Sequence, residues 1–256
     1  MPVRAFGRIV VWEGASLWVF GTHPGDVYPR TAPHAHHAVQ VTLALRGTVN
    51  LYTDGDSYAG TAAAIAPDVP HTFQADVAVA HLFVEPESRL GRALTGRLFQ
   101  RTPLAPLDAA SFADCISRLR GWYDRPDRTD AQLIELGRAL VSQLSEEQPG
   151  ASVPDPRVRR ILAWAPAQIR NPVSLADAAR LVGLSSGRAR HLFVEQTGLA
   201  FRTWLLWLRL QKAVEGYARG MTLTDAALDA GFSDSAHFSR TFRSMFGVTA
   251  DSLALL

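Results

Sequence analysis

The sequence predicts an α+β protein with a β-rich N-terminal half and an all-helical C-terminal domain. Short β-rich runs separated by turn residues fill the first 85 or so positions, and helical spacing of apolar residues begins at Ser88. Residues 174–198 and 222–247 then repeat one helical pattern. With 256 residues and 47% hydrophobic content, the chain is long enough for two domains with separate cores.

Residues 1–86 are expected to form an antiparallel β-barrel or sandwich. The runs Ser16–Phe20, Val39–Leu45 and Thr48–Tyr52 are rich in β-branched and aromatic residues. Turn-forming segments such as Asp54–Asp56 interrupt the β-rich stretch. Short strands joined by tight turns are typical of antiparallel barrels and sandwiches.

Residues 87–146 are predicted to be a helical accessory segment, because apolar residues recur there at helical spacing. The longest stripe consists of Leu133, Leu136, Leu140 and Leu144. This segment should pack on the β-domain or form a dimer interface. Residues 147–154 combine charge, glycine and proline, which is the composition of a linker, so residues 155–256 are expected to form a second domain.

The C-terminal domain contains two divergent copies of one helical unit, 48 residues apart. Each copy begins with a hydroxyl residue three positions before an aspartate, a pattern that caps a helix N-terminus. The pairs are Ser174 with Asp177 and Thr222 with Asp225. A glycine follows each first helix, Gly183 in one copy and Gly231 in the other, and can adopt positive φ in a tight turn.

The second helix of each copy has a polar and basic outer face. The predicted outward positions are Gly187, Arg190 and His191 in the first copy and Ser235, Ala236, His237 and Arg240 in the second. An arginine can donate two hydrogen bonds to guanine, worth about 1 to 3 kcal/mol of discrimination. For any single one of these residues, exposure to solvent on a helix surface is as good an explanation as contact with DNA. Two copies with matching caps, glycines and basic helices instead favour a two-footed reader of the DNA major groove.

The segment between the copies, Ala200–Tyr217, is predicted to be a helix sandwiched between two cores. Its apolar residues fall on two opposite faces: Phe201, Trp204, Leu205 and Leu208 on one, and Trp207, Leu210, Val214 and Tyr217 on the other. Such a helix spans about 27 Å, close to the roughly 34 Å between successive major-groove faces of B-DNA. Arg202 and Arg209 share its polar edge, where they could contact phosphate or remain in solvent.

Two segments, Gly231–Thr249 and Phe201–Ala213, resemble the C-terminal signature and the linker helix of the AraC/XylS family of transcription regulators. The resemblance covers residues 155–253 and implies two helix-turn-helix subdomains whose second helices enter adjacent major grooves. Ala250 stands where the family usually has proline, and Gly187 offers no side chain for base readout. The base contacts that the resemblance implies fall on Gly187, Arg190, His191, Ser235, Ala236, His237 and Arg240. The expected DNA-binding residues also include Ser185, Ser186, Arg188 and Arg202.

The N-terminal half carries a histidine pattern that resembles the two cupin motifs. His34, His36, Gln40 and Gly47 follow the spacing of the first motif, and Pro67–His71 resembles the second. If the first motif lies on a strand, His34, His36 and Gln40 project to one face, where the histidine of the second motif could join them inside a cupin-like barrel.

Three interpretations of His34, His36, Gln40 and His71 remain open. Neutral imidazoles suit Zn, Fe, Ni or Cu, so the three histidines could hold a divalent transition metal. Gln40, however, replaces the carboxylate that would neutralise a metal's charge. The same positions could line a metal-free pocket for an organic effector, or belong to a barrel without any ligand. His23, His37 and His81 are expected to be ordinary surface or buried histidines.

Composition narrows the class of protein further. A single cysteine, Cys115, excludes an internal disulfide and a thiolate zinc cluster. Together with the lack of an apolar leader or membrane span, this favours the cytoplasm. Thirteen Arg or Lys face eight Asp or Glu over residues 155–256, against 13 and 16 over residues 1–154, so the C-terminal half is the expected polyanion-binding half.

The leading hypothesis is a sequence-specific, DNA-binding transcription regulator whose cupin-like N-terminal domain senses a small molecule or a metal. Its expected partners are double-stranded promoter or operator DNA, the effector, a second copy in a homodimer, and RNA polymerase if it activates transcription, but no membrane. The alternative is a metal-dependent cupin enzyme with a helical C-terminal extension. Catalysis is not expected, because the chain has no phosphate-binding loop, nucleophile elbow or HExxH motif.

Overall fold

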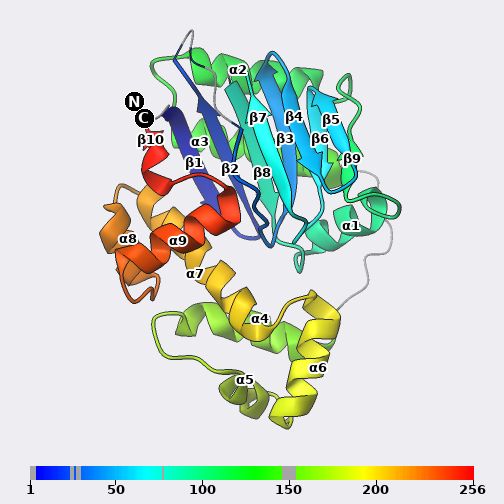
Figure 1. The fold of residues 1–256 in the computed structure, drawn as a ribbon, viewed down its shortest axis with the longest axis vertical. Helices are drawn as coiled ribbons and strands as arrows, with labels where there is room; N and C mark the ends of the chain where they lie inside the picture. Colours follow the sequence, from blue (N-terminus) through cyan, green and yellow to red (C-terminus); the bar gives the residue numbers. More distant parts are fainter. Residues whose placement is uncertain (1–3, 24–25, 27–29, 77, 146–153) are drawn as a thin grey trace. The chain divides into compact units, whose positions relative to one another are not determined.

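The computed structural model describes residues 4–23, 26, 30–76, 78–145 and 154–256. The chain divides into two compact units, one made of Met1–Ala151 with Phe242–Leu256 and the other of Ser152–Thr241. The first unit combines β-sheets with helices and the second is helical, which confirms the predicted α+β class (Figure 1). The predicted linker, residues 147–154, lies outside the described residues except for Pro154.

A seven-stranded sheet with the order β10-β1-β2-β8-β3-β6-β9 forms the main layer of the first unit. Its strands are β1 (Ala5–Trp12), β2 (Ala15–Gly21), β3 (Val39–Arg46), β6 (Ala62–Ile65), β8 (Ala78–Val84), β9 (Leu104–Pro106) and β10 (Leu253–Leu255). The central strand β3 is buried on both faces from Val39 to Leu45, which explains its nearly continuous apolar sequence.

A second, three-stranded sheet has the order β5-β4-β7 and consists of β4 (Val49–Thr53), β5 (Ser57–Gly60) and β7 (His71–Ala75). The expected closed barrel is wrong, and the sandwich alternative describes this unit. Among the described strands, none of one sheet pairs with a strand of the other. His34 and His71 exchange two backbone hydrogen bonds, which join β7 to the loop before β3.

Three helices, α1 (Arg89–Leu98), α2 (Ala113–Asp124) and α3 (Asp130–Ser145), pack on the seven-stranded sheet (Figure 1). Leu119 and Leu133 on these helices join the same apolar core as the strand residues. The leucine stripe of α3 is therefore used for packing on the sheet. The segment also contributes strand β9, which helical spacing did not predict.

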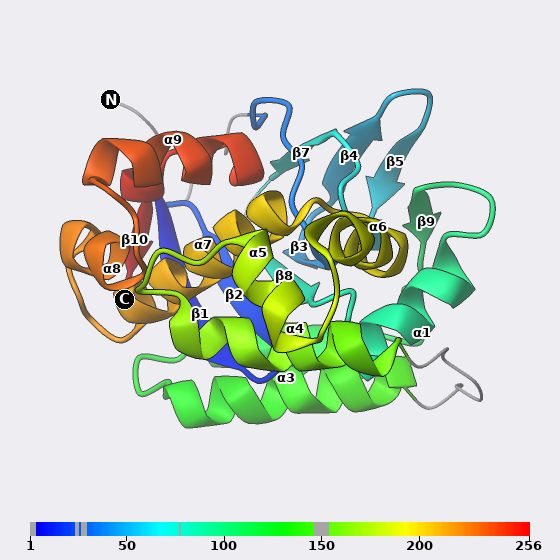
Figure 2. The ribbon, with the colours of Figure 1, turned by 90° about the horizontal axis from the view of Figure 1, so that it is seen from below.

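The second unit contains α4 (Pro156–Gln168), α5 (Leu175–Leu181), α6 (Ser186–Thr197), α7 (Phe201–Ala218), α8 (Leu223–Asp229) and the first residues of α9 (Ser235–Phe246). Helices α4, α5 and α6 pack against one another, and α7 contacts both α6 and α8 (Figure 2). Phe193, Phe201 and Trp204 form the centre of the first core, with T-shaped contacts at ring distances of 5.4 and 5.5 Å.

The predicted caps and turn glycines are present in both helical units. Ser174 forms a capping box with Asp177 at the start of α5. Gly183 and Gly231 have φ values of 68° and 85°, which confirms the expected left-handed turns. In the second copy, Thr222 caps α8 at the position that corresponds to Ser174 in the first copy. The caps and the turn glycines each depend on only a few neighbouring residues.

The end of the chain departs from the expected domain plan. The sequence placed all of residues 155–256 in one C-terminal domain, whereas Phe242–Leu256 belongs to the first compact unit. After α9 the chain forms a short 3-10 turn, Ala250–Ser252, and then β10, which pairs in parallel with β1 at the edge of the sheet.

Replacing Thr222 by alanine should lower the free energy of unfolding of the helical unit by about 1 kcal/mol. The Thr222 hydroxyl accepts a hydrogen bond from the Asp225 backbone N–H at 3.1 Å, and alanine leaves that donor without its cap. Urea unfolding followed by circular dichroism measures the change. Thr224→Ala, an exposed threonine inside the same helix, is the matched control and should be neutral; equal losses in both variants would contradict the capping role.

Candidate functional site

The first helix-turn-helix unit consists of α5 and α6. Ser185 caps α6 by accepting a hydrogen bond from the Arg188 N–H. Ala189, Leu192 and Phe193 are buried beneath the helix, as their spacing predicted. The predicted DNA-facing side chains of this unit are all exposed: Ser185, Ser186, Arg188, Arg190 and His191.

The second unit consists of α8 and α9. Asp234 caps α9, since its carboxylate accepts a hydrogen bond from the His237 N–H at 2.7 Å. Ser235, Ala236 and Arg240 are exposed on α9. His237 is half-buried instead, because its ring packs edge-on against Phe232 at 5.2 Å. Its orientation is therefore more constrained than that of its neighbours.

Some arginines of the helical unit are held in ion pairs within the protein and others are not. Arg180 forms an ion pair with Asp177 and Arg170 with Asp229. In the part of the chain that the structure describes, Arg190 and Arg202 form no ion pair, so their guanidinium groups can meet an outside anion. The backbone N–H of His237 and the Ser233 hydroxyl lower the pKa of Asp234, and the charge of nearby Arg240 adds to this.

Helix α7 joins the two helix-turn-helix units and is buried on both sides, as predicted. Phe201, Trp204 and Leu205 belong to the core of the first helix-turn-helix unit, while Leu210 and Val214 are buried on the opposite face of α7. Its 18 residues give a length of about 27 Å. A helix that is packed into two cores is a stiff spacer, so the two helix-turn-helix units present their second helices at a fixed separation.

The histidine cluster lies where the two sheets of the first unit meet. The structure brings His34, His36 and His71 together, with one ring nitrogen of each within 4.8 Å of the others. His71 begins β7, but His34 and His36 lie in the loop before β3, not on a strand as expected. Gln40 is part of the same cluster and accepts a hydrogen bond from His36 Nε2 at 2.8 Å.

Backbone carbonyls fix the tautomers of two of these rings. His34 Nδ1–H donates to the Ala32 carbonyl at 2.9 Å, and His71 Nδ1–H donates to the Val69 carbonyl at 2.8 Å. The lone pairs are then on Nε2, and the buried Nε2 of His71 has no hydrogen-bond partner among the described residues. Burial, with the nearby imidazole of His71, lowers the pKa of His34 to about 3. Both rings therefore carry a free electron pair at neutral pH.

His81 is a site residue that sequence analysis did not single out. It lies on β8 directly opposite Thr42 of β3, and its Nδ1 is 3.1 Å from the Thr42 hydroxyl. Burial lowers the pKa of His81 to about 3, so this ring is also neutral. Only the register between β3 and β8 brings His81 beside Gln40, and the sequence pattern did not contain that register.

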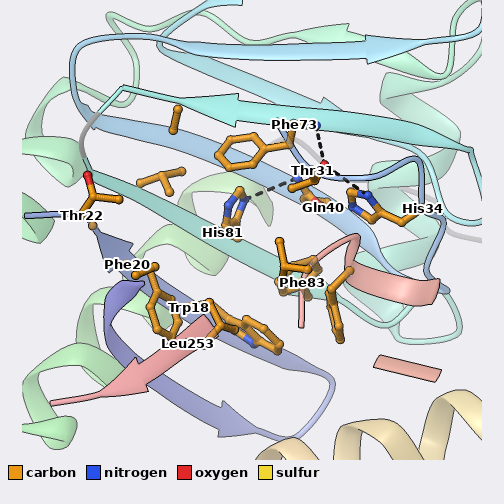
Figure 3. A pocket seen from close by; sticks show the side chains of 16 residues that line it. Trp18, Phe20, Thr22, Thr31, His34, Gln40, Phe73, His81, Phe83 and Leu253 are labelled. Atoms are coloured by element: carbon orange, nitrogen blue, oxygen red, sulfur yellow. Dashed lines mark hydrogen bonds between the residues drawn. The ribbon is translucent and has the colours of Figure 1, made fainter. Parts of the chain in front are cut away.

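A cavity of about 80 Å³ opens beside this cluster, and His34, Gln40 and His81 all line it (Figure 3). Its apolar walls include the rings of Trp18 and Phe83. No charged side chain occurs among the described residues that line it. Thr22 and Thr31 add hydroxyls, so the cavity suits a small neutral molecule with few polar groups.

Sequence comparison supports the assignment of the C-terminal domain. A family described as "Helix-turn-helix domain" matches residues 178–254. The chain is also 30% identical over 127 residues to the HTH-type transcriptional activator RhaS of Escherichia coli, and 30% identical over 124 residues to that of Citrobacter koseri. The C-terminal domain is a helix-turn-helix domain. The RhaS match covers 49% of this chain and 46% of RhaS, so the chain spans about half the length of the curated relatives it matches.

Comparison of structures extends the similarity beyond the helix-turn-helix domain. ToxT of Vibrio cholerae superposes with a TM-score of 0.59 over 93% of this chain and 96% of ToxT, at 14% sequence identity. A ToxT structure with an unsaturated fatty acid bound gives 0.58 over 93% of this chain and 94% of ToxT, also at 14% identity. At this level of identity the similarity establishes a shared fold. No helix among the described residues is both long and apolar enough to span a membrane.

A buried ion-paired histidine beside the site should make stability depend on pH. His37 bonds Asp68 through Nδ1 at 2.7 Å and Glu87 through Nε2 at 2.6 Å. Although burial opposes the charge, the two carboxylates raise the pKa of His37 from 6.5 to about 9. Because this pKa is raised on folding, the stabilisation is complete below pH 6.5 and is lost as the pH rises through about 9.

We expect the free energy of unfolding to fall by about 2 kcal/mol across that range because of His37. Urea unfolding at pH 6 and at pH 9.5 measures the fall, and His37→Asn should reduce it. His23→Asn, at an exposed histidine, is the control and should keep the wild-type dependence. An unchanged pH dependence in His37→Asn would show that this residue does not cause it.

Proposed function

We propose that this protein is a sequence-specific DNA-binding transcription regulator whose N-terminal domain senses a small molecule. The observation that carries the proposal is the pair of capped helix-turn-helix units joined by the stiff helix α7, each with an exposed, arginine-bearing second helix. The RhaS matches to transcriptional activators favour a regulator over the alternative of a metal-dependent enzyme.

In this proposal α6 and α9 enter successive major grooves of double-stranded DNA. Arg190 and Arg240 are the strongest candidates for base contacts, because a guanidinium can bind guanine with two hydrogen bonds. Serines at the helix starts and arginines at the rim would bind phosphates. The proposed phosphate-contacting residues are Ser185, Ser186, Arg188 and Arg202. A homodimer, and contact with RNA polymerase during activation, belong to the same proposal.

A footprint on the DNA upstream of the protein's own gene and its neighbours tests this function. The intact chain should protect a site of about two helical turns, since α7 spaces the second helices for successive grooves. The assay is repeated with cell extract added as a source of effector. A chain that protects no site under any of these conditions is not a sequence-specific regulator.

Removing Arg240 and Arg202 should have different effects on DNA binding. Arg240→Ala should cost about 1 to 3 kcal/mol at the operator and relax sequence preference at one base pair. Arg202→Ala should weaken all sequences alike and reduce the salt dependence of binding by about one phosphate contact. Binding isotherms at several salt concentrations separate the two, with Arg118→Ala on α2 as a control that should change neither. Uniform effects from both variants would refute these roles.

The cavity in the first unit supports the sensing part of the proposal. It is lined by buried rings, neutral imidazoles and an amide, and its lining residues all belong to the compact unit that contains the β-sheets. A ToxT structure holds an unsaturated fatty acid, so this shared fold accommodates a small organic ligand in at least one protein.

The three histidines favour a second candidate for the sensed species, a divalent transition metal. His34, His36 and His71 converge within 4.8 Å, and carbonyl hydrogen bonds orient two of the rings with their Nε2 lone pairs available. Three neutral histidines are a known ligand set for zinc, and hydrogen bonds on the opposite ring nitrogen are typical of such ligands. Gln40 orients His36 but adds no negative charge. When bound, the metal would supply a Lewis-acid centre beside the cavity.

Dialysis of the intact protein against Zn²⁺ or Co²⁺, followed by metal analysis, tests this site. Wild type should retain a single ion per chain, and Co²⁺ should give the visible absorption of a tetrahedral complex. His71→Gln removes one ligand and should weaken binding at least about 100-fold. His23→Gln, outside the cluster, should bind as wild type does. If His71→Gln retains the metal as tightly as wild type, the cluster is not the site.

A further inference from the structure

The last fifteen residues of the chain, Phe242–Leu256, belong to the first compact unit, which we call the sensor unit, although they follow the residues of α9 that we propose to read DNA. Strand β10 pairs with β1 in parallel through Ala5–Leu253, Phe6–Ala254 and Gly7–Leu255, and the Leu256 N–H donates to the Gly7 carbonyl at 2.9 Å. The Ala32 N–H donates to the Gly247 carbonyl at 3.0 Å. We refer to Phe242–Leu256 as the C-terminal segment.

Close contact with the histidine loop fixes where this segment lies. Gly247 has a φ of 70°, and a Cβ placed there would lie 2.4 Å from the Ala32 carbonyl oxygen and 2.5 Å from His34 Nδ1. Only glycine satisfies both the backbone angle and the space. The segment is therefore fitted closely against the loop that carries the candidate ligands.

The C-terminal segment also forms one wall of the cavity. Phe246, Val248 and Leu253 line it beside the strand residues. Figure 3 labels Leu253 among them. The Phe246 ring lies 4.7 Å from Trp18 and 5.7 Å from Phe83, ring to ring. Any molecule in this cavity thus touches the segment that continues directly from α9.

The size of the cavity decides what must happen when a ligand enters. Its volume is about 80 Å³, room for roughly five water molecules, whereas an apolar cavity of about 150 Å³ is known to hold benzene. An aromatic molecule that is to be fully buried there therefore needs one wall to move. Strands β2 and β8 each have neighbours on both sides, but β10 is an edge strand held over three residue pairs. Of the strands that line the cavity, β10 has the fewest paired residues, three against five for the edge strand β7.

We propose that the C-terminal segment is the movable wall of the effector cavity. A small, neutral aromatic ligand with one hydrogen-bonding group binds among Trp18, Phe83 and His81 only when Phe246 and β10 move outward. The ligand then shifts the chain toward the state with the segment released, because it has more affinity for that state. This inference rests on the proposed sensing function and names the ligand class and the element that responds.

The consequence for DNA binding follows from the continuity of α9. Arg240 is six residues before Phe246 on one unbroken helix, or about 9 Å along its axis. Releasing Phe246 removes the anchor at the C-terminal end of the helix whose N-terminal half presents Ser235, Ala236 and Arg240. Effector binding is thereby coupled to the second recognition helix without an intermediate element.

A reversible lock tests the proposal in a single protein. Phe6 and Ala254 are direct partners in the β1–β10 pairing, so Phe6→Cys with Ala254→Cys places two sulfurs within reach of a disulfide. Burial raises the pKa of the native Cys115 thiol to about 11, which keeps it out of the exchange. The oxidised double variant holds the segment in place, and reduction frees it without any change of sequence.

Binding of 2-naphthol, a neutral aromatic with one hydroxyl, is measured by fluorescence for the reduced and oxidised forms. The reduced form should bind, and oxidation should weaken binding at least tenfold. Each single-cysteine variant is a control and should be insensitive to oxidation. Equal binding in both forms would overturn the movable wall, and no binding of 2-naphthol or phenol in either form would overturn the ligand class.

Hydrogen exchange of the wild-type chain gives an independent measurement. Adding 2-naphthol should accelerate exchange of the Leu253–Leu256 amides at least tenfold and leave those of β8 unchanged or slower. Binding without faster exchange at Leu253–Leu256 would overturn the proposal. Neither measurement requires DNA. Failure to find an operator would refute the proposed regulator function, whereas the binding and exchange results decide separately whether the C-terminal segment moves.

Discussion

Helix α9 must satisfy two packing environments at once, and much of the molecule is arranged around that constraint. Its residues up to Thr241 belong to the helical unit, where Phe238 is fully buried, while Phe242 and Phe246 belong to the sensor unit. The exposed face between these anchors carries Arg240. Because a helix of 12 residues bends little over this length, the proposed release of Phe246 would alter the restraint on the residues proposed to face DNA.

The buried polar side chains inside the sensor unit lower its folding stability. Burying polar side chains without full hydrogen bonding lowers stability, and His71 retains a buried ring nitrogen without a partner among the described residues. Four neutral imidazoles and Gln40 are gathered at one end of an otherwise apolar core. Such a concentration of buried polar groups beside a cavity is typical of a binding site.

Features that depend on a few neighbouring residues could be predicted from the sequence. The capping pair Ser174 and Asp177 and the turn residue Gly231 act within one helical turn, so a short stretch of sequence specifies them. The two buried faces of α7 follow from helical periodicity alone. Convergence of His34, His36 and His71 could also be expected, but only because their spacing resembles a known motif.

The tertiary structure decided how the sheets meet, which strands are neighbours and where the chain ends. Alternation of apolar residues predicts strands but carries no information on their register, so the open sandwich and the place of His81 opposite Thr42 could not be derived. The pairing of β10 with β1 joins residues about 250 positions apart, and no local signal marks it. The sequence determined the two helix-turn-helix units, because their capping and packing patterns are local; long-range packing alone decided that the end of the chain forms a wall of the cavity.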